Sequence, residues 1–144
     1  MSSAGAGPEA LRLTEPELAR WGEQLGRGLP DGAVVHLRGE LGTGKTTLAR
    51  ALVRGLGATD AVSSPTYALV HHYHASGGDI YHVDCFRLRH PADSADLDWP
   101  ALAAARALVV EWPERAAGWV PAPSVTVELL HDPLDPDRRA VRRA

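Results

Sequence analysis

The 144-residue sequence predicts an α/β protein with a mixed, mostly parallel central sheet flanked by helices. Two observations support this prediction. A short apolar run at 33–37 leads through a glycine-rich segment into a helical pattern, and a second apolar run at 107–110 ends in the carboxylate of Glu111. Strands that alternate with helices in this way are typical of a layered α/β fold, which places its ligands at the carboxyl ends of the parallel strands.

The first half of the chain predicts helix, strand and helix. A capping box followed by apolar residues at helical spacing indicates the first helix, with Thr14, Glu17, Leu18, Trp21 and Leu25. After the strand at 33–37, a second helix is indicated by Leu48, Leu52, Val53 and Leu56, and Gly57 ends it. Residues 1–12 are small and polar, so we expect a disordered lead, and not a signal peptide, before a single domain at 13–144.

An antiparallel hairpin is expected next. Residues 67–73 and 80–88 are rich in β-forming side chains, and the segment ASGG at 75–78 joins them. The first strand contains the stretch HHYH, in which two histidines at i and i+2 share a face. No cysteine or carboxylate at zinc-like spacing accompanies them, so the sequence favours an ordinary strand surface over a metal site.

The last third predicts a helix and three strands. Residues 93–107 are rich in alanine and are expected to be helical, with Pro100 interrupting or restarting the helix. The buried strand at 107–110 follows, and residues 125–130 and 138–143 are expected to pair as C-terminal edge strands.

Composition narrows the class of partner. The net charge of −3 provides no basic field for direct binding to nucleic acid, so no DNA partner is expected. The single cysteine, Cys85, cannot form an internal disulfide and favours a buried thiol in a reducing, cytoplasmic setting. No apolar run approaches the roughly 20 residues of a membrane span, so no membrane partner is expected.

The segment GELGTGKTT matches the Walker A pattern G-x-x-x-x-G-K-[ST] through Gly39, Gly44, Lys45 and Thr46. The glycines let backbone N–H groups surround phosphate oxygens, and the helix N-terminus adds its positive end. Of the 15 basic residues only Lys45 is a lysine, and a compact ammonium reaches between β- and γ-phosphates better than a planar guanidinium. We therefore predict a P-loop NTPase fold that binds ATP and Mg²⁺, with the Thr46 hydroxyl as a metal ligand.

A P-loop site also needs a carboxylate at the end of a neighbouring strand, to hold Mg²⁺ directly or through water. Asp84 ends the run IYHV, and Glu111 ends the run ALVV. We expect both to act with Lys45 in catalysis. One of them would serve the metal and the other would orient the attacking water, and either assignment remains open.

Four segments in order, GELGTGKTT, SSPTYALVHHY, YHVDCFRL and VVEWPER, resemble the TsaE (YjeE) family over roughly residues 13 to 130. The resemblance implies a small ATPase, weak alone and stimulated by partners. It implies a role in forming N6-threonylcarbamoyladenosine in tRNA, where the protein would engage the TsaB–TsaD complex and meet tRNA only through it.

The resemblance also implies site residues. Nucleotide contacts would come from the P-loop, from a switch-like segment and from one tryptophan: Leu41, Gly42, Thr43, Gly44, Lys45, Thr46, Thr47, Ser64, Thr66 and Trp112. Asp84 and Glu111 match the two acids of the family, whereas Phe86 stands where the family usually has tyrosine. Two other functions stay open: a nucleotide-dependent binding or assembly module with negligible turnover, and a small-molecule kinase, which is less favoured.

Overall fold

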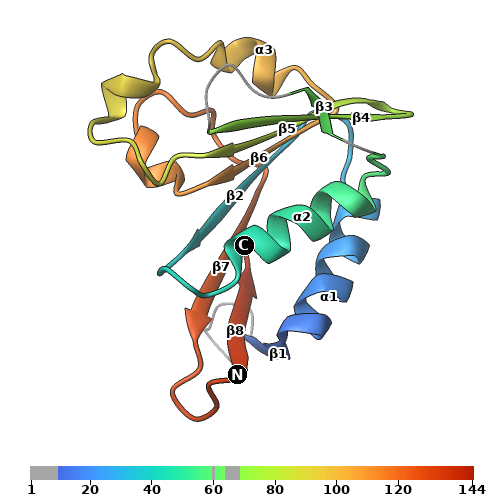
Figure 1. Cartoon of the computed structure of the whole chain (residues 1–144), viewed down its shortest axis with the longest axis vertical. Helices are drawn as coiled ribbons and strands as arrows, with labels where there is room; N and C mark the ends of the chain where they lie inside the picture. The colour runs from blue at the N-terminus through green and yellow to red at the C-terminus, as the bar shows by residue number, and fades with distance from the viewer. Residues whose placement is uncertain (1–9, 60, 64–68) are drawn as a thin grey trace.

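The computed structural model describes residues 10–59, 61–63 and 69–144. Its strands form one eight-stranded sheet in the order β1-β8-β7-β2-β6-β5-β4-β3 (Figure 1). The strands are β1 (Leu11–Thr14), β2 (Ala33–Gly39), β3 (Ala61–Ser63), β4 (Val70–Ala75), β5 (Gly78–Asp84), β6 (Ala107–Glu111), β7 (Val125–His131) and β8 (Arg138–Arg143). The helices are α1 (Glu15–Arg27), α2 (Lys45–Gly55) and α3 (Trp99–Ala103), with 3₁₀ turns η1 (Pro91–Ser94) and η2 (Pro113–Ala116).

The four central strands β7, β2, β6 and β5 run parallel, and antiparallel strands flank them on both sides. The predicted hairpin is β4 and β5, and the predicted C-terminal pair is β7 and β8. This arrangement confirms the α/β class and the mixed sheet. The hairpin is shorter than expected, because its second strand ends at Asp84 and residues 85–88 leave the sheet.

Strand β1 was not predicted. It pairs antiparallel with β8, so the C-terminal pair lies inside the edge of the sheet and β1 forms the edge. Leu11 and Arg12 belong to this strand, although the sequence analysis placed them in the lead. The strand has only four residues, and its partner lies more than 120 residues away in the chain, so no local pattern marked it.

The helix predicted for residues 93–107, with Pro100 interrupting or restarting it, is wrong in length. The segment forms η1, the five-residue helix α3 and an irregular connection to β6. Pro100 lies in the first turn of α3, where the absence of an N–H is tolerated, and Asp98 caps the helix by accepting from the Ala101 N–H at 3.2 Å. Pro100 therefore restarts the helix, because a proline in a helix interior would collide with the preceding turn.

Two apolar clusters cover the two faces of the sheet. On one face α1 and α2 pack against Val35, Leu37 and Val109, and on the other α3 and the 3₁₀ turns pack against Val34 and Val110 (Figure 1). Strands buried on both faces have continuous apolar sequences, which explains the runs AVV and ALVV. This packing holds the start of α2 at the carboxyl ends of the parallel strands.

Helices α1 and α2 approach each other closely. Gly26 of α1 lies so near α2 that a Cβ there would collide with the carbonyl oxygen of Leu52. The predicted capping box is confirmed at the start of α1, where Thr14 Oγ1 accepts from the Glu17 N–H and the Glu17 carboxylate accepts from the Thr14 N–H. Every helix in the described part of the chain is too short or too polar to span a bilayer.

The thiol of Cys85 provides a test of this packing. Cys85 is fully buried, and its burial raises the pKa of the thiol to about 12. At pH 8 the native protein should hold on the order of a thousandfold less thiolate than a free cysteine, so iodoacetamide should leave it unlabelled. Mass spectrometry after labelling, with and without urea, measures this. Rapid labelling of the native protein would contradict the buried position.

Candidate nucleotide-binding site

The glycine-rich loop lies at the carboxyl end of a central strand, because β2 ends at Gly39 and α2 begins at Lys45. Gly44 has φ +104°, in the left-handed region that strains any side chain. A Cβ on Gly39 would collide with the carbonyl oxygen of Leu129 on β7. Among the described residues no side chain caps α2, so the N–H groups of its first turn remain to bind an anion.

Lys45 spans the loop from the first turn of α2. Its ammonium donates to the backbone carbonyls of Gly39, at 2.5 Å, and Glu40, at 2.7 Å, and lies 4.4 Å from the ring centre of Trp112. The side chain is only 5% exposed. Burial lowers the pKa of Lys45, and the negative charge of Glu111 opposes that shift. The ammonium is therefore held within the loop that would surround a phosphate.

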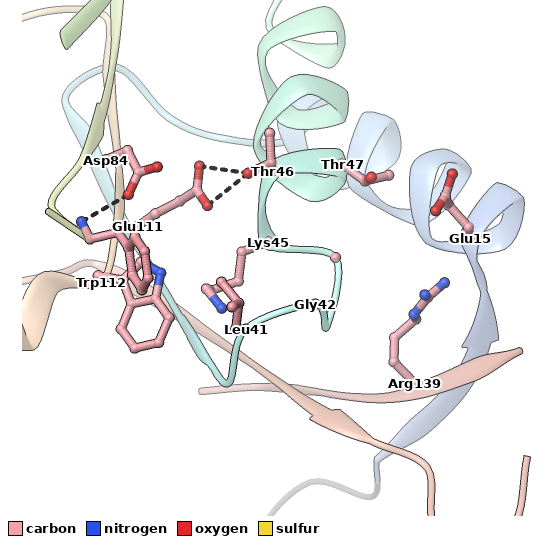
Figure 2. Close-up of a pocket in the computed structure, with 12 residues that line it drawn as sticks. Glu15, Leu41, Gly42, Lys45, Thr46, Thr47, Asp84, Glu111, Trp112 and Arg139 are labelled. Atoms are coloured by element: carbon pink, nitrogen blue, oxygen red, sulfur yellow. Dashed lines mark hydrogen bonds between the residues drawn. The ribbon is translucent and has the colours of Figure 1, made fainter. Parts of the chain in front are cut away.

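Glu111 connects the P-loop helix to the sheet. The Thr46 hydroxyl donates to Glu111 Oε1 at 3.1 Å, and His82 Nε2 lies 2.6 Å from Glu111 Oε2 (Figure 2 shows the Thr46 contact). Glu111 is 2% exposed and His82 is 4% exposed. A ring N–H donates and a carboxylate oxygen accepts, so the hydrogen bond runs from His82 Nε2 to Glu111 Oε2. The two donors hold the carboxylate in one orientation at the start of α2.

Asp84 lies beside Glu111. The parallel strands β5 and β6 place the two residues in register, so the two carboxylates reach the same edge of the sheet. Asp84 Oδ1 accepts from the Phe86 N–H at 3.0 Å (Figure 2). The structure therefore brings together both predicted acids and the two predicted P-loop residues, Lys45 and Thr46.

These groups line one cavity of about 280 Å³ (Figure 2). Its lining comes from the loop and the start of α2, from both acids, from α1 and β8, and from the segments that follow β5 and β6: Glu15, Leu41, Gly42, Gly44, Lys45, Thr46, Thr47, Asp84, Phe86, Glu111, Trp112 and Arg139. The cavity has two ends. Asp84 and Glu111 lie at one end, Glu15 and Arg139 lie at the other, and the P-loop runs between them (Figure 2).

Of the predicted nucleotide contacts that lie on described residues, Thr43 does not line this cavity. Thr43 is buried, and its hydroxyl donates to the Glu40 carbonyl at 2.8 Å, so its side chain stabilises the loop from within. Ser64 and Thr66 lie outside the described residues.

Trp112 shapes the acidic end. It has φ +55°, and no other non-glycine residue in the described ranges has a positive φ. Such conformations cost of order 1–3 kcal/mol and persist where the surrounding structure requires them. The strained backbone turns the ring over the Lys45 ammonium and against Phe86, with ring centres 5.1 Å apart.

Glu15, His82 and Arg139 belong to this site but were not predicted from the sequence. His82 precedes Asp84 by two positions on β5, and this spacing, which puts both side chains on one face, was the available signal. Arg139 was treated as part of a charged edge strand, yet it lines the cavity. Its Nε and Nη1 are buried and have no hydrogen-bond partner among the residues described here. No local pattern could identify Arg139, because the pairing of β8 with β7 and β1 brings it to the loop.

A glycine-rich loop that leads from a parallel strand into a lysine-bearing helix, with a carboxylate on the adjacent parallel strand, defines a protein of the P-loop class. The solved structure of YdiB from Bacillus subtilis supports the fold: it has a TM-score of 0.71 and 20% identity, and the match covers 96% of this chain and 88% of that one.

Residues 13–141 match the family model described as "Threonylcarbamoyl adenosine biosynthesis protein TsaE". Several relatives carry the name "tRNA threonylcarbamoyladenosine biosynthesis protein TsaE", among them one from Treponema pallidum and one from Streptomyces coelicolor. The one from Treponema pallidum is 38% identical over 78% of this chain and 84% of its own length. The one from Streptomyces coelicolor is 44% identical over 65% of both chains. The chain belongs to the TsaE family of tRNA threonylcarbamoyladenosine biosynthesis proteins.

The contact between His82 and Glu111 predicts an energetic coupling. In a double-mutant cycle with His82→Ala and Glu111→Gln, we expect a coupling of about 1–3 kcal/mol in the free energy of unfolding, because both groups are buried and bonded to each other. Urea denaturation measures it. His36→Ala is the matched control, since His36 is equally buried but bonds to the Pro121 carbonyl. Additive effects for His82 and Glu111 would contradict the contact.

Proposed function

We propose that the protein is a Mg²⁺-dependent ATPase that converts ATP and water to ADP and phosphate, and that it serves as an accessory subunit of the TsaB–TsaD complex in forming N6-threonylcarbamoyladenosine in tRNA. The observation that supports this most strongly is the 3.1 Å hydrogen bond between Thr46 and Glu111 at the end of the P-loop. It joins a P-loop hydroxyl to a strand-end carboxylate, which is the pair that holds Mg²⁺ in this class of site.

The donor set fits Mg²⁺. This ion prefers oxygen ligands and uses few protein groups, and the Thr46 hydroxyl and the Glu111 carboxylate are two such groups at the acidic end of the cavity. When bound, the ion would neutralise charge on the β- and γ-phosphates. Glu111 is therefore proposed as the carboxylate that serves the metal, because it already contacts Thr46.

The remaining groups have complementary roles in the proposal. The N–H groups at the start of α2 and the Lys45 ammonium bind the phosphates, with Leu41, Gly42, Gly44 and Thr47 forming the cavity around them. Asp84 is proposed to orient the attacking water, since it lies next to Glu111 in register but forms no hydrogen bond with Thr46 in the described part of the chain. Ser64 and Thr66 stay predictions from the family resemblance.

The partners come from the family alone. The TsaE name places the family in tRNA modification, and the net charge of −3 supports a tRNA contact made through the TsaB–TsaD complex and not through a basic surface of this chain. A cytoplasmic site of action agrees with the single, buried thiol of Cys85.

The first test measures phosphate release from ATP and Mg²⁺, with and without purified TsaB–TsaD complex from the same source. We expect the complex to stimulate release, and Lys45→Ala to reduce the stimulated rate on the order of a hundredfold or more, because the ammonium that neutralises the phosphates is lost. Arg54→Ala is the matched control, since it removes an exposed cation from the same helix.

The outcomes separate the competing functions. ATP binding without stimulated turnover would replace the ATPase with a nucleotide-dependent binding or assembly module. Transfer of the phosphate to a small metabolite would indicate a kinase.

The position of Arg139 predicts a separate effect, on the affinity for nucleotide. Two of its guanidinium nitrogens, Nε and Nη1, are buried without a hydrogen-bond partner among the described residues. The guanidinium lies beside Gly44, and an arginine in that position is suited to bind the phosphate chain. We expect Arg139→Ala to raise the Kd for ADP and for ATP about tenfold and to change kcat little, because Arg139 lies at the end of the cavity away from the acids. Calorimetric titration measures the Kd. Arg143→Ala, on the same strand but exposed, is the control, and unchanged affinity in Arg139→Ala would exclude the contact.

A further inference from the structure

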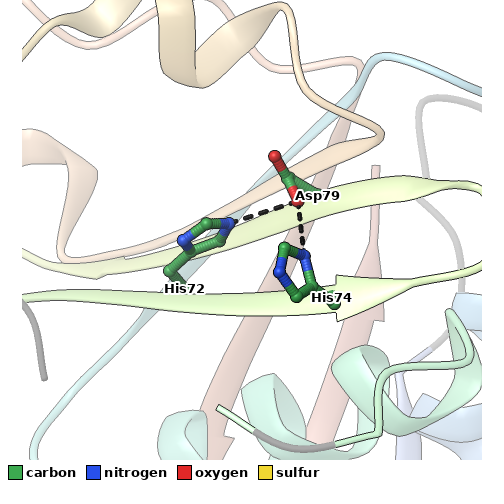
Figure 3. Close-up of side chains that lie close together, drawn as sticks. All are labelled: His72, His74 and Asp79. Atoms are coloured by element: carbon green, nitrogen blue, oxygen red, sulfur yellow. Dashed lines mark hydrogen bonds and ion pairs between the residues drawn. The ribbon is translucent and has the colours of Figure 1, made fainter. Parts of the chain in front are cut away.

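The hairpin of β4 and β5 carries a second group of metal-ligating side chains, apart from the nucleotide-binding site (Figure 3). His72 and His74 lie on one face of β4, and the antiparallel register places Asp79 of β5 directly opposite His74. Asp79 lies near the start of β5 and Asp84 at its end, so about 17 Å of strand separates this group from the acidic end of the cavity.

The distances within the group fit a metal ion. One ligand atom from each of His72, His74 and Asp79 lies within 4.8 Å of the other two. Asp79 Oδ1 is 2.8 Å from His74 Nδ1 and 3.3 Å from His72 Nε2 (Figure 3). Ligands at about 2.0–2.2 Å from a tetrahedral ion lie about 3.3–3.5 Å apart. The His74 side chain is 62% exposed, so its ring can turn by the small amount required.

The state of His72 distinguishes this group from a simple hydrogen-bonded cluster. The hydrogen bond between His74 and Asp79 satisfies that pair without an ion. His72 Nε2, by contrast, is buried, and its 3.3 Å approach to Asp79 Oδ1, the atom that already contacts His74, is not a hydrogen bond, so this nitrogen has no hydrogen-bond partner within the residues that the structure describes. Its ring is held by stacking on Tyr81, with centres 4.5 Å apart and planes at 18°. A buried nitrogen without a partner is costly, and a metal ion would remove that cost.

The donor types of the group also suit a cation. Two imidazole nitrogens and one carboxylate oxygen suit ions such as Zn²⁺, Ni²⁺ and Cu²⁺, whereas Mg²⁺ and Ca²⁺ prefer oxygen ligands throughout.

We propose that His72, His74 and Asp79 form a binding site for a divalent transition-metal ion, with Zn²⁺ as the representative ion and water completing its coordination. The sequence alone disfavours a metal at HHYH, because no carboxylate stands at zinc-like spacing along the chain. The hairpin supplies that carboxylate from the opposite strand. A bound ion links β4 to β5 near the turn of the hairpin, and this site does not depend on the proposed ATPase activity.

Calorimetric titration of the full chain with ZnCl₂ tests the proposal. Excess Mg²⁺ is present to occupy the proposed magnesium site at Thr46 and Glu111. We expect one tight equivalent of Zn²⁺, with His74→Ala and Asp79→Asn each weakening it on the order of tenfold or more. His90→Ala is the matched control, because His90 is an exposed histidine away from the hairpin, and it should leave the affinity unchanged.

A second readout reports the ligands directly. In NMR spectra of the ring nitrogens, Zn²⁺ should shift the signals of His72 and His74 and leave those of His90 in place. Circular dichroism of each variant confirms that it is folded. Zn²⁺ binding equal in the wild type and in a folded His72→Ala/His74→Ala variant, or ring signals of His72 and His74 that do not move, would overturn the proposal.

Discussion

The buried carboxylate of Glu111 is the constraint on which the candidate site depends. A charge removed from water is costly unless hydrogen bonds and opposite charge compensate it. Here the compensation comes from the Thr46 hydroxyl on α2, from His82 on β5 and from the nearby Lys45 ammonium. Two of these partners belong to the start of α2 and one to β5, while Glu111 itself ends β6, so satisfying one carboxylate fixes α2, β5 and β6 relative to one another.

The cavity that results has different groups at its two ends. The carboxylates of Asp84 and Glu111 lie at one end, the Arg139 guanidinium lies at the other with the Glu15 carboxylate beside it, and the P-loop with Lys45 lies between them. Acidic groups suit a cation and a reacting water, while an arginine suits an anion. This division separates the groups proposed for chemistry from a group proposed for affinity. Trp112 completes the acidic end at the cost of a strained backbone.

Strand β5 contributes a residue to the nucleotide-binding site and another to the proposed transition-metal site. Its end carries Asp84 beside the P-loop, and its start carries Asp79 opposite His74. Because a strand is stiff along its length, an ion that links β4 and β5 at the turn would restrict the motion of β5, the strand that positions Asp84. The hairpin therefore joins the nucleotide-binding site to the proposed transition-metal site through one continuous element.

The sequence by itself determined the features that depend on neighbouring residues: the loop from Gly39 to Lys45, the capping box at Thr14 and the acids that end β5 and β6. These follow from backbone geometry and side-chain period within a few residues, so a single stretch contains the whole signal. Only the tertiary structure decided the position of β1, the approach of Arg139 to the loop and the meeting of Asp79 with His72 and His74. Each of these depends on which strands pair and in which register, and strand pairing joins residues that no local pattern connects.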